Sequence, residues 1–241
     1  MLRLCSACSL LAATFGCSTI DSEDLETSGI NAAIEVVRSI DGSNVSVSLS
    51  AGTLNFVSLN NGDALKATAD GQTVDLGESN VLNAITYFAH LDANAQGEEV
   101  TVSLERADKT PAPASTVVLP ASVQITAPTA AAAFSRADDD IVVDITGEAS
   151  TDALRLSWSG DCIDADGIDV PADQVQVTIN AGTLKKRPQD DANDPDSQPI
   201  ADTCTVSLRV ERRVSGNLDP AYQGGQITAL TTSTRDISST R

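Results

Sequence analysis

Asn44-Val-Ser-Val-Ser-Leu-Ser-Ala-Gly-Thr-Leu54 is the stretch that decides the fold class. Val45, Val47 and Leu49 alternate with serines, so the apolar side chains share one face of an extended chain. This pattern predicts a strand in a sheet that is buried on one side and exposed on the other. Gln174-Val-Gln-Val-Thr-Ile-Asn-Ala-Gly-Thr-Leu184 repeats the apolar phase and ends in the same four residues. Duplication of one unit explains the repeat, and chance similarity between strands is the alternative.

Short strands and frequent turns continue on both sides of this stretch. Asn61-Gly62 and Asp70-Gly71 supply the positive φ angles of tight hairpins. We expect the longest strand at 204–210 and a frayed end at 233–241. The other expected strands cover residues 30–36, 45–49, 65–67, 73–76, 81–91, 99–106, 123–125, 141–145, 154–158, 175–179 and 227–230. Strands this short, without a clear amphipathic helix, favour an all-β fold of antiparallel sandwiches.

The chain is long enough for two domains that each bury a core. Three prolines between residues 108 and 121 remove backbone donors and stiffen the chain, so we expect the boundary there. The predicted domains are 29–119 and 120–241. Residues 116–119 are either the closing strand of the first domain or part of the bridge. Residues 17–28 are polar and acidic without periodicity, which predicts a flexible tether.

Residues 1–16 have the pattern of a secretory signal. Arg3 precedes an uncharged, mostly apolar run from Leu4 to Phe15, which is too short for a membrane span. Gly16-Cys17 resembles the lipobox of bacterial lipoproteins, in which the cysteine is lipidated and becomes the new N-terminus, although Thr14 and Phe15 depart from the usual Leu and Ala or Ser. The resemblance implies a lipid anchor on Cys17 and a place in the cell envelope, in the outer membrane, facing the periplasm or the surface. An ordinary cleaved signal is the alternative.

The net charge restricts the class of partner, and the cysteines indicate a disulfide. A formal net charge of -19 argues against nucleic acid, because there is no basic patch to neutralise phosphates. Cys5 and Cys8 would leave with the signal. Cys162 and Cys204 then remain as an even pair in an oxidising compartment, where a disulfide is the default.

Together these features resemble bacterial lipoproteins with tandem immunoglobulin-like domains, and both halves share the pattern. The resemblance implies two antiparallel immunoglobulin-like β-sandwich domains in tandem. In the family hallmark, cysteines on strands B and F flank a tryptophan on strand C. Trp158 fits strand C, but Cys162 follows it in phase on the same predicted strand, and Cys204 begins strand F. The bond is therefore expected to join the end of C to the start of F.

Two acidic stretches are the only candidates for a metal site. Asp164, Asp166 and Asp169 surround Gly167 in an expected loop, and carboxylate oxygens are calcium ligands. The spacing does not match an EF-hand, so a solvated acidic loop is the competing interpretation. The second stretch, 190–196, reads as an exposed connection, and its Asp190 or Asp191 would complete the calcium shell. No other cofactor is indicated.

Catalytic motifs are missing from the sequence. It contains no Gly-x-Ser-x-Gly, no His-Glu-x-x-His and no glycine-rich phosphate loop, and its one histidine, His90, suits a structural role. The sequence therefore predicts a lipid-anchored structural or binding module that is not an enzyme. Its membrane contact is through the lipid, and a protein or glycan partner would bind at loops or at a sheet edge. A calcium-dependent adhesion module, an accessory subunit of an envelope assembly and a hydrolase stay as alternatives.

Overall fold

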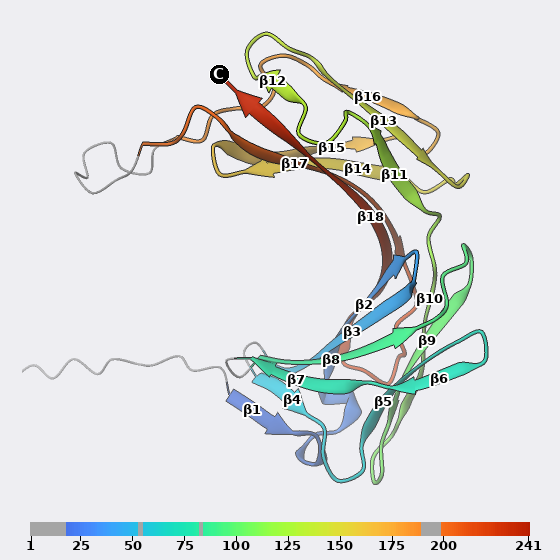
Figure 1. The fold of residues 1–241 in the computed structure, drawn as a ribbon. Coiled ribbons are helices and arrows are strands. Elements are labelled where there is room, and N and C mark those ends of the chain that lie inside the picture. Colours follow the sequence, from blue (N-terminus) through green and yellow to red (C-terminus); the bar gives the residue numbers. More distant parts are fainter. Residues whose placement is uncertain (1–17, 53–54, 82–83, 189–198) are drawn as a thin grey trace, which may run out of the picture.

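The computed structural model describes residues 18–52, 55–81, 84–188 and 199–241. These residues form eighteen strands and two short 3-10 helices, η1 (Ser22–Asp24) and η2 (Thr27–Gly29), so the predicted all-β class is confirmed. In this part of the chain no helix is long and apolar enough to cross a membrane. The strands build two lobes joined in an open arc (Figure 1).

The first lobe is a sandwich of two layers. One layer holds β7 (Gly77–Val81), β8 (Ala84–Leu91), β3 (Gly42–Ala51) and β2 (Asn31–Ser39) in that order. The other holds β6 (Gln72–Asp75), β5 (Ala64–Ala69), β9 (Glu99–Glu105) and β10 (Ala112–Val118). In the immunoglobulin lettering, β2 and β3 are strands A and B, β5 and β6 are C and C′, and β7 to β10 are D to G. The layers are then D-E-B-A against C′-C-F-G, which is an immunoglobulin-like strand order. In addition, β1 (Ser18–Asp21) pairs in parallel with β4 (Asn55–Ser58), which pairs with the end of β3.

The second lobe has the same plan. One layer contains β11 (Val123–Ala127), β13 (Ile141–Gly147) and β16 (Gln176–Ile179). The other contains β15 (Ile163–Val170), β14 (Leu154–Gly160), β17 (Cys204–Ser215) and β18 (Gly224–Thr240). The short β12 (Ala133–Ser135) pairs in parallel with the end of β18. This arrangement is A-B-E against C′-C-F-G, so both lobes confirm the immunoglobulin-like sandwich.

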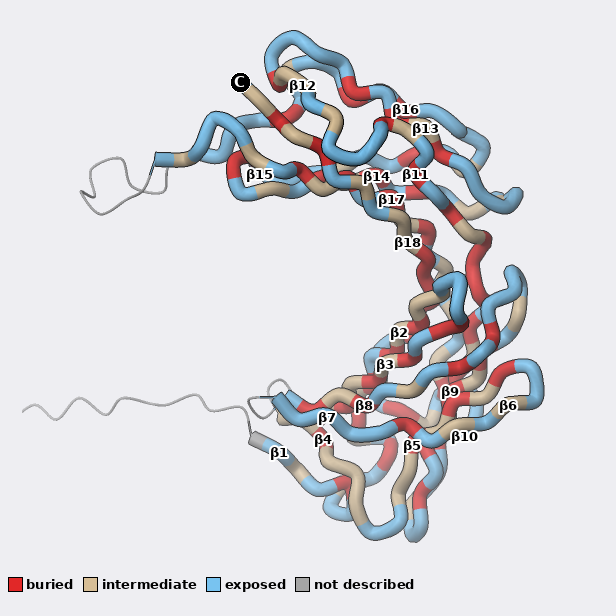
Figure 2. The backbone as a smooth tube through the Cα atoms, in the orientation of Figure 1, coloured by how far each residue is buried: buried red, intermediate tan, exposed pale blue. Residues whose placement is uncertain are grey.

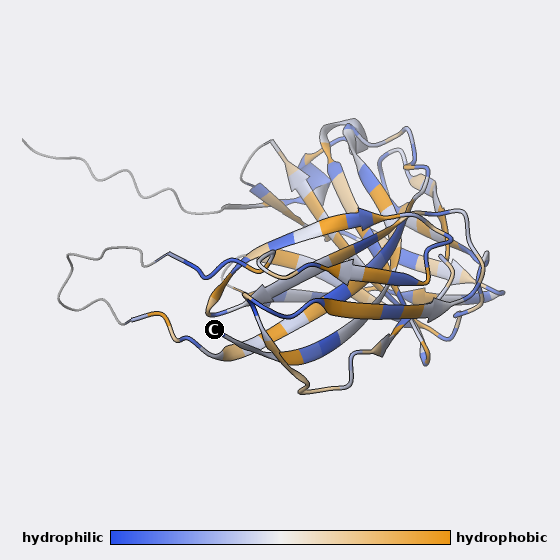
Figure 3. Ribbon diagram, turned by 90° about the horizontal axis from the view of Figure 1, so that it is seen from above, coloured by the Kyte–Doolittle hydropathy of each residue, from blue (hydrophilic) through white to orange (hydrophobic). Residues whose placement is uncertain are grey.

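Apolar and polar residues alternate along many strands, as the banding in Figure 3 illustrates, and the apolar ones point into the lobe. The first core includes Ile34, Val47 and Leu104, and the second includes Leu156, Trp158 and Leu208. Buried segments gather inside each lobe and continue along β18 between the lobes (Figure 2). The cores are aliphatic because the chain has few aromatic residues.

One long strand joins one layer of each lobe into a single sheet. The first half of β18 pairs in parallel with β2 of the first lobe, from Gly224–Asn31 to Thr231–Arg38. On its other side, β18 pairs antiparallel with β17 without interruption from Thr228 to Ser239, which includes parts of both halves. Ile227 and Ala229 of β18 belong to the first core, whereas Ile237 belongs to the second. The connected sheet lies on the inner side of the arc, with the other two layers outside it (Figure 1).

This shared strand corrects several expectations. A division at residue 119/120 assigns 120–241 to the second domain, but residues such as Tyr222 and Ile227 pack in the first core. The longest strand is β18 and not the one that begins at Cys204, and residues 233–240 are strand and not a frayed end. In this segment Ile237 packs in the second core and the buried Ser239 accepts a hydrogen bond from Arg136, so a polar residue stands where apolar alternation would be expected.

Two further expectations differ near the hairpins and the N-terminus. The strand expected at 81–91 corresponds to β8, which begins at Ala84, and its antiparallel partner β7 at 77–81 was not expected. The tether expected at 17–28 is folded wherever it is described: β1, η1 and η2 pack on the first lobe, with Ser22 and Thr27 buried. The Pro-rich segment contains β10, so residues 116–118 close the first sandwich.

The internal repeat also has a structural explanation. Residues 44–51 form strand B of the first lobe, but residues 176–179 form strand E of the second, so the two copies occupy different positions. They share a turn after the strand, in which Gly52 and Gly182 have φ of 65° and 77°. A second similarity, Thr101–Leu104 with Thr205–Leu208, does fall on strand F in both lobes.

Candidate functional site

The candidate functional residues fall into three groups. Cys17 and the acidic pair Asp190 and Asp191 lie outside the described residues, so the lipid anchor and any calcium ligand from that segment stay predictions. The cysteine pair and the acidic residues around Gly167 are described. A third group, at the junction of the lobes, was not expected from the sequence.

The structure has a disulfide between Cys162 and Cys204, with a Cα–Cα distance of 5.8 Å. Cys162 lies in the tight turn between β14 and β15, not on the strand of Trp158 as expected, and Cys204 is the first residue of β17. The bond therefore joins the end of strand C to the start of strand F, which agrees with the expected connection. The buried Arg136 donates to Ser239 Oγ and to the Asp202 carbonyl beside the bond.

The acidic residues around Gly167 lie on a strand and not in a loop. Asp166 and Asp169 are three residues apart in the regular part of this strand, β15, so their side chains lie on opposite faces. Asp169 pairs with Arg155 on β14 at 2.9 Å, and Asp166 accepts a hydrogen bond from the Gly167 amide. Within the described residues, no three ligands of the His, Cys, Asp or Glu type gather. Calcium binding at Asp164, Asp166 and Asp169 stays an untested prediction.

His90 has a structural setting. One ring nitrogen lies 3.1 Å from Asn44 Oδ1 on the paired strand, and the other lies 3.2 Å from the Asp41 carbonyl. A Cβ on Gly42 would come within 2.8 Å of the ring, so the glycine provides the space for it. The histidine therefore fixes the turn between β2 and β3.

Arg38, at the end of β2, connects both lobes and the chain between them. Its guanidinium donates to the carbonyls of Asn94 and Pro120 and pairs with Glu148 of the second lobe at 2.7 Å. The Glu148 carboxylate also accepts the Ser122 amide at 2.7 Å. The Arg38 and Ser122 hydrogen bonds lower the pKa of Glu148 to about 2. We call this group the waist.

A second arginine, Arg212 on β17, binds the same connection; it lies in register with Thr231 of β18, the residue that also pairs with Arg38. Arg212 is buried and donates to the carbonyls of Ala121, Ser122 and Glu148. Burial lowers its pKa. Because both arginines bind the backbone of the connection, the lobes are held by more than the shared strand.

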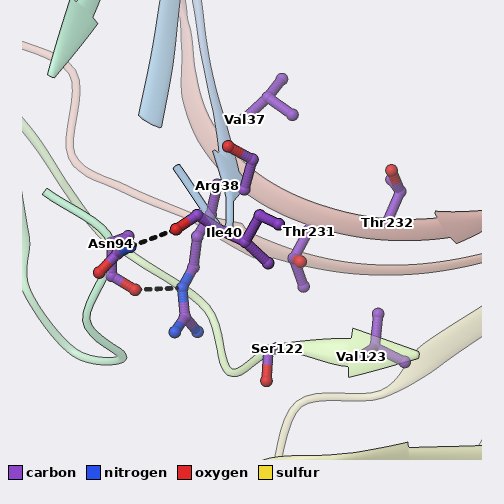
Figure 4. Close-up of a pocket in the computed structure, with 9 residues that line it drawn as sticks. Val37, Arg38, Ile40, Asn94, Ser122, Val123, Thr231 and Thr232 are labelled. Atoms are coloured by element: carbon purple, nitrogen blue, oxygen red, sulfur yellow. Dashed lines mark hydrogen bonds between the residues drawn. The ribbon is translucent and has the colours of Figure 1, made fainter. Parts of the chain in front are cut away.

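A cavity of about 570 Å³ opens at the waist, next to the end of β2 (Figure 4). Its lining is mixed, with both polar and apolar side chains: Val37, Arg38, Ser39, Ile40, Asn94, Ser122, Val123, Thr231 and Thr232. Ile40 is 90% exposed, and its carbonyl accepts a hydrogen bond from Asn94 at 2.8 Å. The sequence offered no signal for this cavity, because its residues come from four separate segments.

The segment after Cys17 is held by a buried ion pair. Arg106, directly after β9, lies 2.7 Å from Asp63, and both side chains are almost fully buried. The same guanidinium donates to the carbonyls of Ser22 and Leu25. Thr27 Oγ1 receives a further hydrogen bond from Arg106 and donates to the Thr110 carbonyl. Residues 22–27 are therefore fixed on the first lobe.

No protein-family model matches the chain, and no curated protein matches it. Among solved structures, the chicken CNTN1 FN1-FN3 domains are 11% identical over 88% of this chain and 69% of that chain, with a TM-score of 0.31. A segment of two fibronectin type III domains from chicken tenascin is 12% identical over 83% of this chain and 98% of that chain, with a TM-score of 0.24.

The BSP domain of a biofilm associated protein is 13% identical over 88% of this chain and 30% of that chain, with a TM-score of 0.25. All three TM-scores are below 0.5. The immunoglobulin-like assignment therefore rests on the strand order of the two lobes.

Proposed function

We propose that this protein is a lipid-anchored component of the cell envelope that acts as a stiff structural or binding module. The anchor is the lipid on Cys17, and the two lobes form the module. The ordered segment after Cys17 is the observation that carries the proposal. Because β1 begins at Ser18, the lipid and the first lobe are separated by no free linker.

Stiffness follows from the shared sheet. Two lobes joined by one flexible connection reorient freely, and relative motion is the usual expectation for tandem domains. Here β18 belongs to both lobes, and Arg38 and Arg212 bind the connection at residues 120–122. An anchor at the tip of the first lobe thus determines the position of the second, at the other end of the arc (Figure 1).

The anchor is tested by exchanging single cysteines in the full chain. Cys17→Ser should move the protein from the detergent phase to the aqueous phase after detergent partition of whole envelopes. Cys8→Ser is the matched control, since Cys8 is also a leader cysteine but would be removed with the leader. Intact mass should show a lipid-sized increase on the wild-type chain and on Cys8→Ser, but not on Cys17→Ser. An unmodified Cys17, or cleavage at another residue, would contradict the anchor.

A further inference from the structure

The Cys162–Cys204 disulfide has a hydrogen-bond donor on each of its sulfurs. Nη1 of Arg136 lies 3.5 Å from Cys162 Sγ, and the backbone amide of Cys162 donates to Cys204 Sγ at 3.3 Å. The sulfur of a disulfide is a weak acceptor, whereas a thiolate is an anion that such donors and a nearby cation stabilise strongly. The contacts therefore favour the reduced, anionic form of the pair more than the bonded form.

Arg136, which directly follows β12, keeps its place without the sulfur. The residue is 9% exposed, and its guanidinium also donates to Ser239 Oγ and to the Asp202 carbonyl, both at 3.0 Å. Its own carbonyl accepts the Gly182 amide at 2.6 Å. Because these partners belong to three different segments, opening the disulfide leaves the guanidinium beside Cys162. The cation is therefore already in position for a thiolate.

The two sulfurs differ in how far they are buried. Cys162 is 1% exposed, whereas Cys204, the first residue of β17, is only partly buried. An incoming thiolate therefore attacks Cys204 Sγ, and Cys162 is the leaving group. Since a sulfur leaves faster when its anion is stabilised, the access to Cys204 and the charge beside Cys162 favour the same direction of cleavage.

A basic cavity of about 530 Å³ adjoins Arg136. Its lining includes Lys185, Lys186 and Arg241, and Asp202 is the one acidic side chain among the described residues that line it. Lys186 pairs with Asp202 at 2.6 Å. This hydrogen bond and the charge of Lys186 lower the pKa of the Asp202 carboxyl, and the charges of Arg241 and Arg136 add to the effect. The cavity lining is therefore cationic, although the chain has a net charge of -19.

The acidic groups around the cavity limit the size of the anion that fits. Five further aspartates of this end lie outside the described lining: Asp138, Asp139, Asp140, Asp161 and Asp164. Asp139 accepts the Ser135 amide and Asp140 accepts the Ala181 amide, at 2.7 Å each. The acidic stretch 190–196 lies outside the described residues. Because these charges repel an extended polyanion, the cationic lining suits a small anion that makes direct contact with it.

We propose that Cys162–Cys204 is a thiol–disulfide exchange site for a small thiol that carries carboxylates. The thiolate attacks Cys204 Sγ and forms a new S–S bond, while the electron pair of the broken bond goes to Cys162 Sγ beside Arg136. A second thiolate then attacks the small-molecule sulfur of this mixed disulfide, and Cys204 leaves as a thiolate. Two thiols are thereby oxidised to their disulfide, and the protein pair is reduced by two electrons. In an oxidising compartment the resting form is the protein disulfide. This activity goes beyond the structural or binding module proposed above.

The first test uses the full chain purified in detergent, with glutathione as the small anionic thiol. Exchange is stopped with acid, free thiols are alkylated, and peptide mapping locates the attached glutathione whatever the state of Cys17. We expect it on Cys204, with Cys162 as the free thiol. The rate should rise in proportion to glutathione, while Trp158 fluorescence stays that of the folded lobe. Glutathione on Cys162, or a rate that levels off at the unfolding rate, would overturn the proposal, because reduction through unfolding needs no exchange site.

The class of thiol is tested by its charge. At equal thiolate concentration, glutathione should react faster than the cationic thiol cysteamine, against the direction set by the net charge of the chain. Lys185→Gln should reduce this preference. Lys66→Gln on the first lobe is the matched control and should leave it unchanged. Faster reaction of cysteamine with the wild-type chain, or an equal change in both variants, would overturn the assignment of an anionic thiol.

A second pair of variants tests the role of Arg136. Arg136→Gln should shift the equilibrium with glutathione about tenfold toward the protein disulfide, which is about 30 mV for a two-electron couple. Arg155→Gln is the matched control, because Arg155 is an exposed arginine of the same lobe and should leave the equilibrium unchanged. No shift in Arg136→Gln, or an equal shift in both, would overturn the proposal. If Arg136→Gln loses the folded fluorescence of Trp158, the position of glutathione and the rate law in the wild-type chain decide.

Discussion

The two lobes share an immunoglobulin-like strand order but join strands C and F at opposite ends. In the first lobe, Asp63 precedes strand C and Arg106 follows strand F, and the two form a buried ion pair. In the second, the disulfide joins the end of C to the start of F. Each aliphatic core thus has one strong connection across the same strand pair. Only that of the second lobe depends on an oxidising compartment.

We expect the largest loss of stability from breaking the ion pair of the first lobe. Asp63→Asn leaves the Arg106 charge buried without its carboxylate, which costs about 3–5 kcal/mol of unfolding free energy. Urea denaturation followed by circular dichroism measures this loss. Glu105→Gln is the matched control, because it removes the more exposed pair with Lys66 on the same two strands and should cost much less. Equal losses of unfolding free energy in the two variants would show that the Asp63–Arg106 pair does not stabilise this lobe more than the exposed pair does.

Removing the disulfide should have a slightly smaller effect. The closed loop spans 42 residues of sequence separation, for which the chain-entropy model gives about 4 kcal/mol as an upper estimate. Cys162→Ala with Cys204→Ala should lower the urea midpoint by the corresponding amount. Trp158, the only tryptophan, reports on the second core by its fluorescence.

The same double variant tests the coupling of the lobes. Because β18 lies in both, fluorescence and circular dichroism should show coincident transitions. Separate transitions, with the first lobe unchanged, would mean that the shared sheet does not couple the lobes thermodynamically. Free thiols in protein isolated from envelopes would contradict the pairing itself.

What the sequence could predict depends on how local the signal is. Alternation at Val45, Val47 and Leu49 fixes a strand within a few residues, and the Asn-Gly and Asp-Gly turns gave β5 and β6 correctly. The parallel pairing of β2 with β18 joins residues about 190 apart in the chain and leaves no local pattern. That residues 18–29 are folded was missed for the same reason, because Arg106, which binds the carbonyls of this segment, is distant in sequence.

The site was less predictable than the fold. The pairing of Cys162 with Cys204 followed from cysteine arithmetic, which needs no geometry. The calcium interpretation of Asp164, Asp166 and Asp169 assumed a loop. The three residues lie instead on strand β15, where Asp166 and Asp169 fall on opposite faces. The waist cavity could be found only from the tertiary structure, because its lining residues come from separate segments of the chain.

At the waist we expect a smaller, pH-dependent effect. The pKa of Glu148 is lowered from 4.5 to about 2 by Arg38 and the Ser122 amide, so its contribution to stability is complete above pH 4.5 and is lost as the pH falls toward 2. The Glu148 side chain is 42% exposed, so solvent screening limits the effect to about 1 kcal/mol. Glu148→Gln should remove this part of the pH dependence between pH 5 and 2. Glu26→Gln, which breaks the exposed pair with Lys109, is the control and should leave the profile nearly unchanged.

The smallest expected effect is that of calcium, and it tests whether the acidic strand of the second lobe has a function that the first lobe lacks. A specific site would raise stability by RT ln(1 + [L]/Kd), about 2.7 kcal/mol at a hundredfold excess over Kd. Asp164, Asp166 and Asp169 share a strand and Asp169 is paired with Arg155, so we expect only screening of the net charge. Calcium and magnesium at constant ionic strength should then give equal melting temperatures, and Asp166→Asn should change neither. A calcium-specific rise that Asp166→Asn abolishes would contradict this expectation, and would mean that the three carboxylates do act together with ligands from elsewhere in the chain.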